Sequence, residues 1–404
     1  MRPIWQLGIR LRPLPDPFRV FLASGESSGD GLGAGLMRHL RQQATGDVLF
    51  TGIGGPLMES EGLHSLFPSS ELAIIGPTAV VPRLPHLWRR LKQSVRFILD
   101  NPPDVLVLID CPEFTQRIAR RVRRVRPDIM IIKYVAPQAW AWRAGRVPRM
   151  RAHLDHIMAF LPFEPEFYAR LNGPETTYVG HPMIEKVGLM RAPEGGNTLP
   201  DSARPVLLVL PGSRRSEIDH LMAVFAQTVK QVSDKLGPLE VLIPAVPHLE
   251  ADITRRAAAW PVPVTILRGE DEKWQGFRRA RAALAASGTV SLELALARVP
   301  MVIAYKVEPW SAIIMRRLIK TSTVVLANLV IGRNAVPEFL QERARPDLMA
   351  AALSQLISGG PARDVQIEAF TGLDHLMGIG TGSPSERAAR VVIEAYQRRV
   401  ETGT

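Results

Sequence analysis

The sequence predicts an α/β protein made of two Rossmann-like domains that face a cleft. Short apolar runs alternate with amphipathic helical patterns along most of the chain, which is the pattern of parallel sheets covered by helices. The alternation stops in a stretch rich in Pro, Gly, Asn and Ser, residues 191–204, and then starts again. In each half the first apolar run ends in a turn of small residues. A helical bundle or an all-β fold would not give this order of segments.

The restart of the pattern sets the expected domain boundaries. We expect an N-terminal domain over residues 1–190, a linker over 191–204 and a C-terminal domain over 205–380. An amphipathic helix within residues 381–404 would close the chain, with packing back on the N-terminal domain as one option.

Composition limits the class of protein. The 404 residues include a single cysteine, Cys111, which excludes a disulfide framework and a cysteine-rich metal site and favours a reducing compartment. Residues 1–17 lack the apolar core of a secretory signal. No uncharged apolar run reaches the ~18 residues of a membrane span.

The net charge of +11 is clustered along the chain. Arginines crowd residues 117–126, and residues 88–92 and 316–320 mix bases with bulky apolar side chains. Such mixtures favour an anionic membrane surface or a phosphorylated ligand, and a merely solvated basic face stays open as the alternative. No nucleic-acid-binding signature accompanies the bases, so we expect no nucleic acid partner.

The first half reads as a series of strands and helices. Strands are expected at residues 19–24, 48–53, 104–110, 129–135, 156–161 and 177–180. The turn at residues 25–30 is not GxGxxG, and the second strand ends in Gly54-Gly55 rather than an acidic residue, which argues against NAD.

Two acids follow the most apolar strand of this half, residues 104–110. Asp110 and Glu113 would lie at the carboxyl edge of the sheet, where ligands of open α/β sheets bind. Paired carboxylates at such a place are candidates for general acid–base work. Capping of the next helix is the alternative reading.

A tryptophan-rich loop follows the strand at residues 129–135. Trp140 and Trp142 suit stacking on a sugar ring, and Arg143 suits pairing with a phosphate. Buried structural tryptophans are the alternative.

In the second half, strands are expected at residues 206–210, 239–243, 262–267, 282–286, 299–304 and 324–326. The turn Ser287-Gly288-Thr289 would present backbone N–H groups at a helix N-terminus, where an anion is stabilised. Glu293 follows one helical turn later and suits a ribose diol beside the phosphates, although helix capping stays open. Asn328 and Arg333 belong to a polar patch after the last strand.

Nine segments together resemble the lipid-A-disaccharide synthase family, a family of GT-B glycosyltransferases (family 19). They occur in the family's order and extend from Val20 to about Glu338: SGESSGD (24–30), GIGGPLM (52–58), PDVLVLIDCPEF (103–114), YVAPQAWAWR (134–143), LPFEPEFY (161–168), YVGHP (178–182), LPGSRRSEI (210–218), ASGTVSLE (286–293) and NLVIGRNAVPE (328–338).

The resemblance implies an inverting transferase of lipid A biosynthesis. Its donor would be UDP-2,3-diacylglucosamine and its acceptor 2,3-diacylglucosamine 1-phosphate (lipid X). The products would be a β-1,6-linked disaccharide phosphate and UDP, formed without a cofactor or metal. The family is cytoplasmic and peripheral on the cytoplasmic face of the bacterial inner membrane, and a homodimer stays open.

The resemblance also implies roles for single residues. The donor would be held by the later half, through Gly212, Ser213, Arg214, Ser287, Gly288, Thr289, Glu293, Asn328 and Arg333. The acceptor would contact the earlier half, through Ser28, Gly29, Asp30, Trp140, Trp142 and Arg143. The family commonly reads D-A-P-D-F where this chain has Asp110-Cys111-Pro112-Glu113-Phe114. Glu113 therefore stands at the position of the family's catalytic aspartate, and Asp110 is the second candidate base.

Two other functions fit parts of the sequence. A non-hydrolysing UDP-sugar epimerase has the same two-domain arrangement and would consume a UDP-sugar without an acceptor. A membrane-surface binding protein without catalysis would use the basic clusters alone.

Overall fold

The computed structural model describes residues 13–72, 84–142, 144–193, 204–308 and 321–402. The chain forms two compact units. Unit 1 comprises Met1–Pro182 and Gly380–Thr404, and unit 2 comprises Met183–Ile379. Most of the predicted linker, residues 191–204, lies outside the described residues, and so do Arg143 and the basic segment 316–320.

Unit 1 is built on a seven-stranded parallel sheet in the order β3-β2-β1-β4-β5-β6-β7. Its strands are β1 (Phe18–Ala23), β2 (Val48–Ile53), β3 (His64–Ser65), β4 (Val105–Ile109), β5 (Met130–Tyr134), β6 (His156–Ala159) and β7 (Glu175–Tyr178). All residues of β4 and β5 are buried, because helices cover both faces of the sheet.

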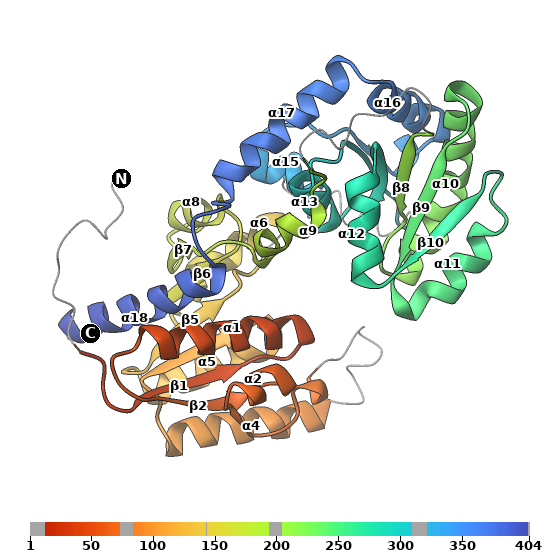
Figure 1. The fold of residues 1–404 in the computed structure, drawn as a ribbon. Coiled ribbons are helices and arrows are strands. Elements are labelled where there is room, and N and C mark those ends of the chain that lie inside the picture. The colour runs from red at the N-terminus through yellow and green to blue at the C-terminus, as the bar shows by residue number, and fades with distance from the viewer. Residues whose placement is uncertain (1–12, 73–83, 143, 194–203, 309–320, 403–404) are drawn as a thin grey trace. The chain divides into compact units, whose positions relative to one another are not determined.

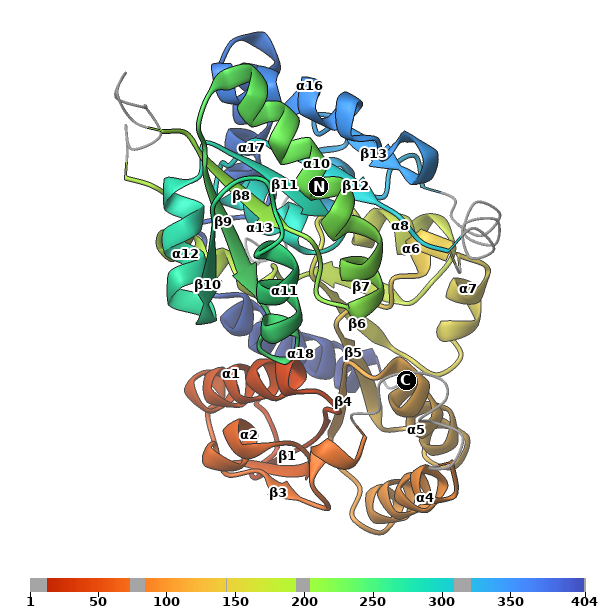
Figure 2. The same cartoon turned by 90° about the vertical axis from the view of Figure 1, so that its right-hand side faces the viewer.

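The helices of unit 1 form a layer on each face of this sheet (Figures 1 and 2). One face is covered by α1 (Ser27–Gln43) and α18 (Pro384–Thr402), which contact each other. The other face packs against α4 (Leu84–Asp100), α5 (Pro112–Val125), α7 (Val147–Met150) and α8 (Glu164–Arg170). Two short helices, α2 (Pro56–Ser60) and α6 (Ala139–Trp142), follow β2 and β5.

Unit 2 has a six-stranded parallel sheet in the order β10-β9-β8-β11-β12-β13. Its strands are β8 (Val206–Leu210), β9 (Glu240–Ala245), β10 (Val264–Arg268), β11 (Ala282–Ala286), β12 (Met301–Tyr305) and β13 (Glu338–Leu340). One face packs against α10 (Arg215–Leu236), α11 (Glu250–Ala257) and α16 (Pro346–Ser358). The remaining helices are α9 (Val187–Met190), α12 (Gly269–Arg279), α13 (Val290–Leu296), α15 (Leu326–Ile331) and α17 (Pro361–Leu376).

The two parallel sheets confirm the predicted α/β fold class, but one expected strand is wrong. Residues 324–326 do not form a strand, and helix α15 begins at Leu326. The carboxylate of Glu338 accepts hydrogen bonds from Thr323 Oγ1 (3.0 Å) and from the Val324 amide (3.1 Å), which fixes the start of that helix. The edge position of the sheet is taken by β13, which pairs with β12. Among the described residues no helix has both the length and the apolar character needed to cross a bilayer.

Candidate active site

The turn after β4 holds Asp110, one of the two predicted acids, in a strained backbone. Asp110 and Cys111 have φ angles of +43° and +32°, in the left-handed region that side chains other than glycine rarely adopt. Such residues cost about 1–3 kcal/mol each and persist only where surrounding contacts fix them. Here Gly25 donates its amide to Asp110 Oδ1 (2.9 Å), and Ser24 Oγ donates to Asp110 Oδ2 (3.2 Å). The β1 turn therefore fixes the position of the Asp110 carboxylate.

A buried lysine lies beneath the same turn. Lys133, the penultimate residue of β5, donates from its amine to the backbone carbonyl of Asp110 and to Thr115 Oγ1 (3.3 Å). Burial lowers the pKa of Lys133 to about 8 and raises the pKa of Asp110, although the Gly25 amide and the lysine charge oppose the rise at Asp110. Burial also raises the pKa of Cys111 to about 12, so this residue is a neutral thiol at neutral pH.

Glu113 lies in a more exposed environment than Asp110. It occupies the second position of α5, and its side chain is 74% exposed. Its Oε1 lies 3.7 Å from Arg146 Nη1. The structure thus offers a half-buried carboxylate fixed by two hydrogen bonds and an exposed one, and the choice of Glu113 as the base stays a prediction.

The residues predicted to contact the acceptor at the start of α1 have unequal environments. Ser28 is exposed, whereas Gly29 packs so closely that an added Cβ would lie 1.8 Å from Asp110 Oδ2. Asp30 is buried, and its carboxylate caps α2 by accepting the amides of Gly55 (2.8 Å), Leu57 (3.0 Å) and Met58 (3.0 Å). Asp30 therefore joins the β1 and β2 turns, and its contact with an acceptor stays a prediction.

Trp140 is fixed by a carboxylate that the sequence interpretation missed. Its indole Nε1 donates to Glu164 Oε1 (3.1 Å), and its ring meets Phe163 edge-on at 5.5 Å. Glu164 is buried, and its Oε2 accepts the amides of Phe160 (3.1 Å) and Leu161 (3.0 Å) after β6. Burial raises the pKa of Glu164 to about 7. The available signal was an acid immediately before a proline, Glu164-Pro165, just beyond a strand.

Trp142 is exposed, unlike Trp140, so the two tryptophans have separable roles. The loop that carries them begins at Val135, a β-branched residue with φ +72° whose amide donates to Met158 O (3.1 Å). Backbone strain thus marks the carboxyl ends of both β4 and β5. Stacking of Trp142 on a sugar stays a prediction.

In unit 2 the turn before α10 is already bound to a carboxylate. Glu217 Oε2 accepts the amides of Ser213 (2.8 Å) and Arg214 (3.2 Å), and Glu217 Oε1 accepts from Arg214 Nη1 (3.0 Å). Gly212 has φ +120°, and an added Cβ would lie 2.4 Å from Glu217 Oε2. The Arg214 side chain is nevertheless 76% exposed, so an anion can reach it from solvent.

The turn before α13 is more open. The Ser287 amide donates to Ala304 O (3.0 Å) within the sheet, which removes it from the predicted set of anion donors. Gly288 and Thr289 are exposed, and nothing lies within 4 Å of a Cβ added at Gly288. Glu293 is held by Lys273 of α12, whose Nζ lies 2.8 Å from Glu293 Oε2. The sequence interpretation missed Lys273.

The two remaining donor candidates differ in burial. Asn328 is buried, and its amide donates to Val336 O (2.9 Å) and accepts from Val336 N (2.9 Å). Arg333 is exposed and follows Gly332, the residue that caps the C-terminus of α15. Asn328 can thus act on a donor only by shaping this loop, whereas Arg333 can reach a ligand directly; both roles stay predictions.

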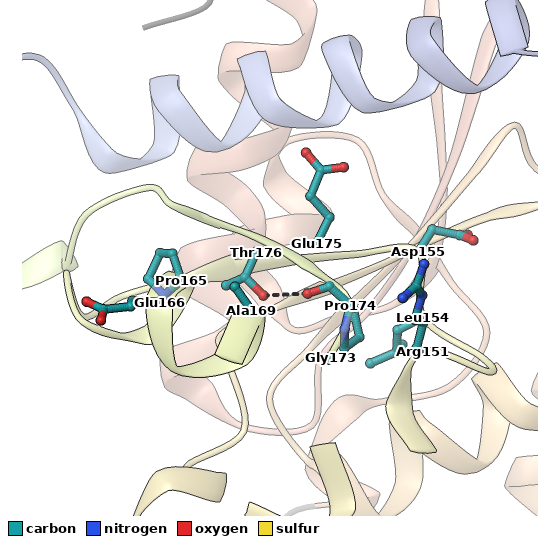
Figure 3. A pocket seen from close by; sticks show the side chains of 10 residues that line it. All are labelled: Arg151, Leu154, Asp155, Pro165, Glu166, Ala169, Gly173, Pro174, Glu175 and Thr176. Atoms are coloured by element: carbon teal, nitrogen blue, oxygen red, sulfur yellow. Dashed lines mark hydrogen bonds between the residues drawn. The ribbon is translucent and has the colours of Figure 1, made fainter. Parts of the chain in front are cut away.

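A pocket of about 700 Å³ lies elsewhere in unit 1 (Figure 3). It is lined by residues at the amino ends of β6 and β7 and on α8, among them Asp155, Glu166 and Thr176. In Figure 3, Glu175 points from the pocket towards α18, where Arg398 lies 3.2 Å away. Because Asp110 follows the carboxyl end of a strand of the same parallel sheet, this pocket is at the opposite edge. It contains none of the predicted site residues.

Comparison with solved structures supports the fold. A putative UDP-N-acetylglucosamine 2-epimerase from Listeria monocytogenes matches with a TM-score of 0.60 at 12% identity, covering 96% of this chain and 97% of that one. The glycosyltransferase of kitacinnamycin matches with a TM-score of 0.61 at 16% identity, covering 94% of this chain and 100% of that one. Identities this low show a shared fold and leave the reaction open.

Comparison by sequence is more specific. Residues 20–376 match the family described as lipid-A-disaccharide synthetase. The lipid-A-disaccharide synthase of Nitrobacter hamburgensis is 50% identical over 379 residues, which is 93% of this chain and 95% of the relative. That of Rhodospirillum centenum is 42% identical over 388 residues, covering 95% and 96%. The chain belongs to the lipid-A-disaccharide synthase family of glycosyltransferases.

Proposed function

We propose that this glycosyltransferase moves the diacylglucosaminyl group of UDP-2,3-diacylglucosamine to the 6-hydroxyl of lipid X with inversion. A bond forms between the acceptor oxygen and the sugar C1, and the bond from C1 to the UDP oxygen breaks. The acceptor proton passes to a carboxylate, and UDP leaves as the anion. The observation that carries the proposal is the strained turn that brings Asp110 and Glu113 to the carboxyl edge of the first sheet.

In this proposal unit 1 binds the acceptor. A hydroxyl nucleophile needs a base within hydrogen-bond reach, and Glu113 has an exposed side chain at the start of α5. Asp110 is the second candidate, because its carboxylate is fixed by Ser24 and Gly25. Trp142 offers an exposed aromatic face for a sugar ring.

Unit 2 binds the donor in the same proposal. Negative charge develops on the diphosphate as UDP leaves, so fixed positive donors stabilise the transition state. Arg214 presents an exposed guanidinium, and Gly288 and Thr289 leave room for a phosphate. Glu293, oriented by Lys273, suits a ribose hydroxyl.

The test is UDP release by the purified full-length protein. We expect release only when UDP-2,3-diacylglucosamine and lipid X are both present. Asp110→Asn and Glu113→Gln, assayed separately, identify the base, and the variant that loses more than about a hundredfold in kcat carries it. Consumption of the UDP-sugar without lipid X would favour an epimerase and contradict the proposal. Full activity in both variants would refute the assignment of the base.

We further propose that unit 1 meets an anionic membrane, and that this membrane is the cytoplasmic face of the bacterial inner membrane. Trp88 of α4 is 45% exposed, and Lys92 Nζ and the Arg121 guanidinium lie 4.9 and 5.0 Å from its ring centre. Leu84, one turn earlier, is also exposed. Basic and aromatic side chains on adjoining helices suit the headgroup region of anionic lipids.

Co-sedimentation with phosphatidylglycerol vesicles tests the membrane proposal. We expect binding that weakens as salt rises and falls about tenfold or more in Trp88→Ala. Leu348→Ala, which removes an exposed apolar side chain of unit 2, is the control and should bind as the wild type does. Equal binding by Trp88→Ala and wild type would contradict the proposed surface. A homodimer stays open, and sedimentation velocity decides it.

A further inference from the structure

Lys133 is an unusual residue for the centre of a parallel sheet. It lies on β5 between the apolar residues Ile132 and Tyr134, and it is fully buried. Its amine contacts the carbonyl of Asp110 and the hydroxyl of Thr115. An amine this deep loses its hydration, and this loss is unfavourable unless charges or hydrogen bonds compensate for it.

The contacts of the lysine all lead to the strained turn. The carbonyl of Asp110 also accepts from Thr115 Oγ1 (2.9 Å), and the same hydroxyl lies 3.1 Å from the carbonyl of Cys111. Two donors from β5 and α5 thus fix the peptide plane that follows Asp110, while Ser24 and Gly25 fix its carboxylate from the β1 side. Contacts from β5, from α5 and from the turn after β1 together stabilise the left-handed backbone conformation of Asp110 and Cys111.

The charge of Lys133 acts on the same residues. The acidic groups that face it are Asp110 and Glu26, and Cys111 is the remaining titratable neighbour. A positive charge beneath Asp110 favours its carboxylate form, whereas burial opposes that form. Lys133 therefore acts on this turn in two ways: its amine donates a hydrogen bond to the Asp110 carbonyl, and its positive charge stabilises the Asp110 carboxylate.

We infer that Lys133 is a positioning residue for the transfer reaction, because it fixes the Asp110–Cys111 turn and so aims the acids at the acceptor. The inference rests on the proposed function, since it assigns the turn a role in the chemistry. Lys133 touches no substrate in this scheme; it acts through Asp110 and through the start of α5.

Lys133→Met tests the inference, because methionine fills similar space without the charge. The Asp110 carbonyl keeps its bond from Thr115 Oγ1, so the variant should fold and keep a melting temperature within a few degrees of wild type. We expect kcat to fall about tenfold or more with KM for both substrates within threefold. If Asp110 is the base, the acidic limb of the pH profile of kcat/KM should also move upwards by about one pH unit.

Two further variants separate position from charge. Ile131→Met changes a buried residue on the same face of β5 and should leave kcat and the pH profile unchanged. Thr115→Val removes the other donor to the Asp110 carbonyl and keeps the charge, so kcat should fall without a shift of the acidic limb. A Lys133→Met variant with kcat within threefold of wild type would overturn the inference. So would one that fails to fold, because the lysine would then serve the fold itself. Wild-type protein that releases no UDP would instead overturn the proposed function.

Discussion

Gly29 and Gly31 lie two residues apart in α1 and give opposite predictions for the same substitution. A Cβ at Gly29 would lie 1.8 Å from Asp110 Oδ2 and 2.4 Å from Ser24 Oγ. A Cβ at Gly31 would meet only Leu57 Cδ1, at 3.9 Å, which is an ordinary contact. Gly31 is exposed, whereas Gly29 is buried against the carboxylate. The pair therefore isolates the effect of moving Asp110.

The magnitude follows from the contacts. In Gly29→Ala the carboxylate must retreat by about 1.5 Å or more to reach van der Waals distance, and it then loses the Gly25 amide, a bond worth about 1.5–3 kcal/mol. Alanine returns about 0.5–1 kcal/mol of helix stability. The net loss in the free energy of unfolding is about 0.5–2.5 kcal/mol. Displacement of a reacting group by about 1 Å can lower kcat about a hundredfold.

Thermal melting and UDP release measure the two effects. We expect Gly29→Ala to melt several degrees lower and to lose most of its activity. Gly31→Ala should gain about 0.5–1 kcal/mol and keep activity within twofold. If the two variants behave alike in both assays, the packing of Asp110 against α1 does not control the site, and the reasoning fails.

Three further predictions concern other residues of the site. Because the pKa of Glu164 is raised, the native state binds more protons than the unfolded state between pH about 4.5 and about 7, and the free energy of unfolding falls as pH rises through this window. Urea denaturation across that range should show the fall, and the Glu164→Gln variant should show a smaller dependence on pH. Trp142→Ala should raise KM for lipid X with the melting temperature unchanged, as initial-rate kinetics and melting will show. Asn328→Ala should lose about 1–3 kcal/mol in urea denaturation, because both polar groups of Val336 lose their partner, whereas Arg333→Ala should affect only KM for the donor.

The order of elements was predictable because periodicity and small-residue turns are local. The strand preceding Asp110 and the turn preceding Glu293 were expected from a few adjacent residues and are present in the structure. The strand expected at residues 324–326 failed because a distant acid, Glu338, caps that segment. An apolar run of three residues carries too little information to reveal such a competitor.

The supporting side chains of the site were not predictable from adjacent residues. Lys133 meets Asp110 from the next strand, Glu164 meets Trp140 from the start of α8, and Lys273 meets Glu293 from another helix. Each contact depends on how the strands and helices are ordered in space, and the spacing of residues along the sequence does not reveal that order. A charged residue inside an apolar strand, as in Ile132-Lys133-Tyr134, was a local sign that a distant partner exists.

The backbone amides of the turn before α10, which were predicted to bind the donor, already have a partner within the chain. The amides of Ser213 and Arg214 suit an anion, and the chain's own Glu217 already binds both. A diphosphate at these amides would have to displace a carboxylate that also caps a long helix, and it would meet the repulsion of a buried like charge. The exposed guanidinium of Arg214 carries no such penalty. The side chain of Arg214, rather than the turn's amides, should therefore bind the leaving UDP, and Arg214→Ala should lose about 2–4 kcal/mol in kcat/KM while Ser213→Ala keeps its activity. A loss below threefold in Arg214→Ala would reverse this order and point back to the amides.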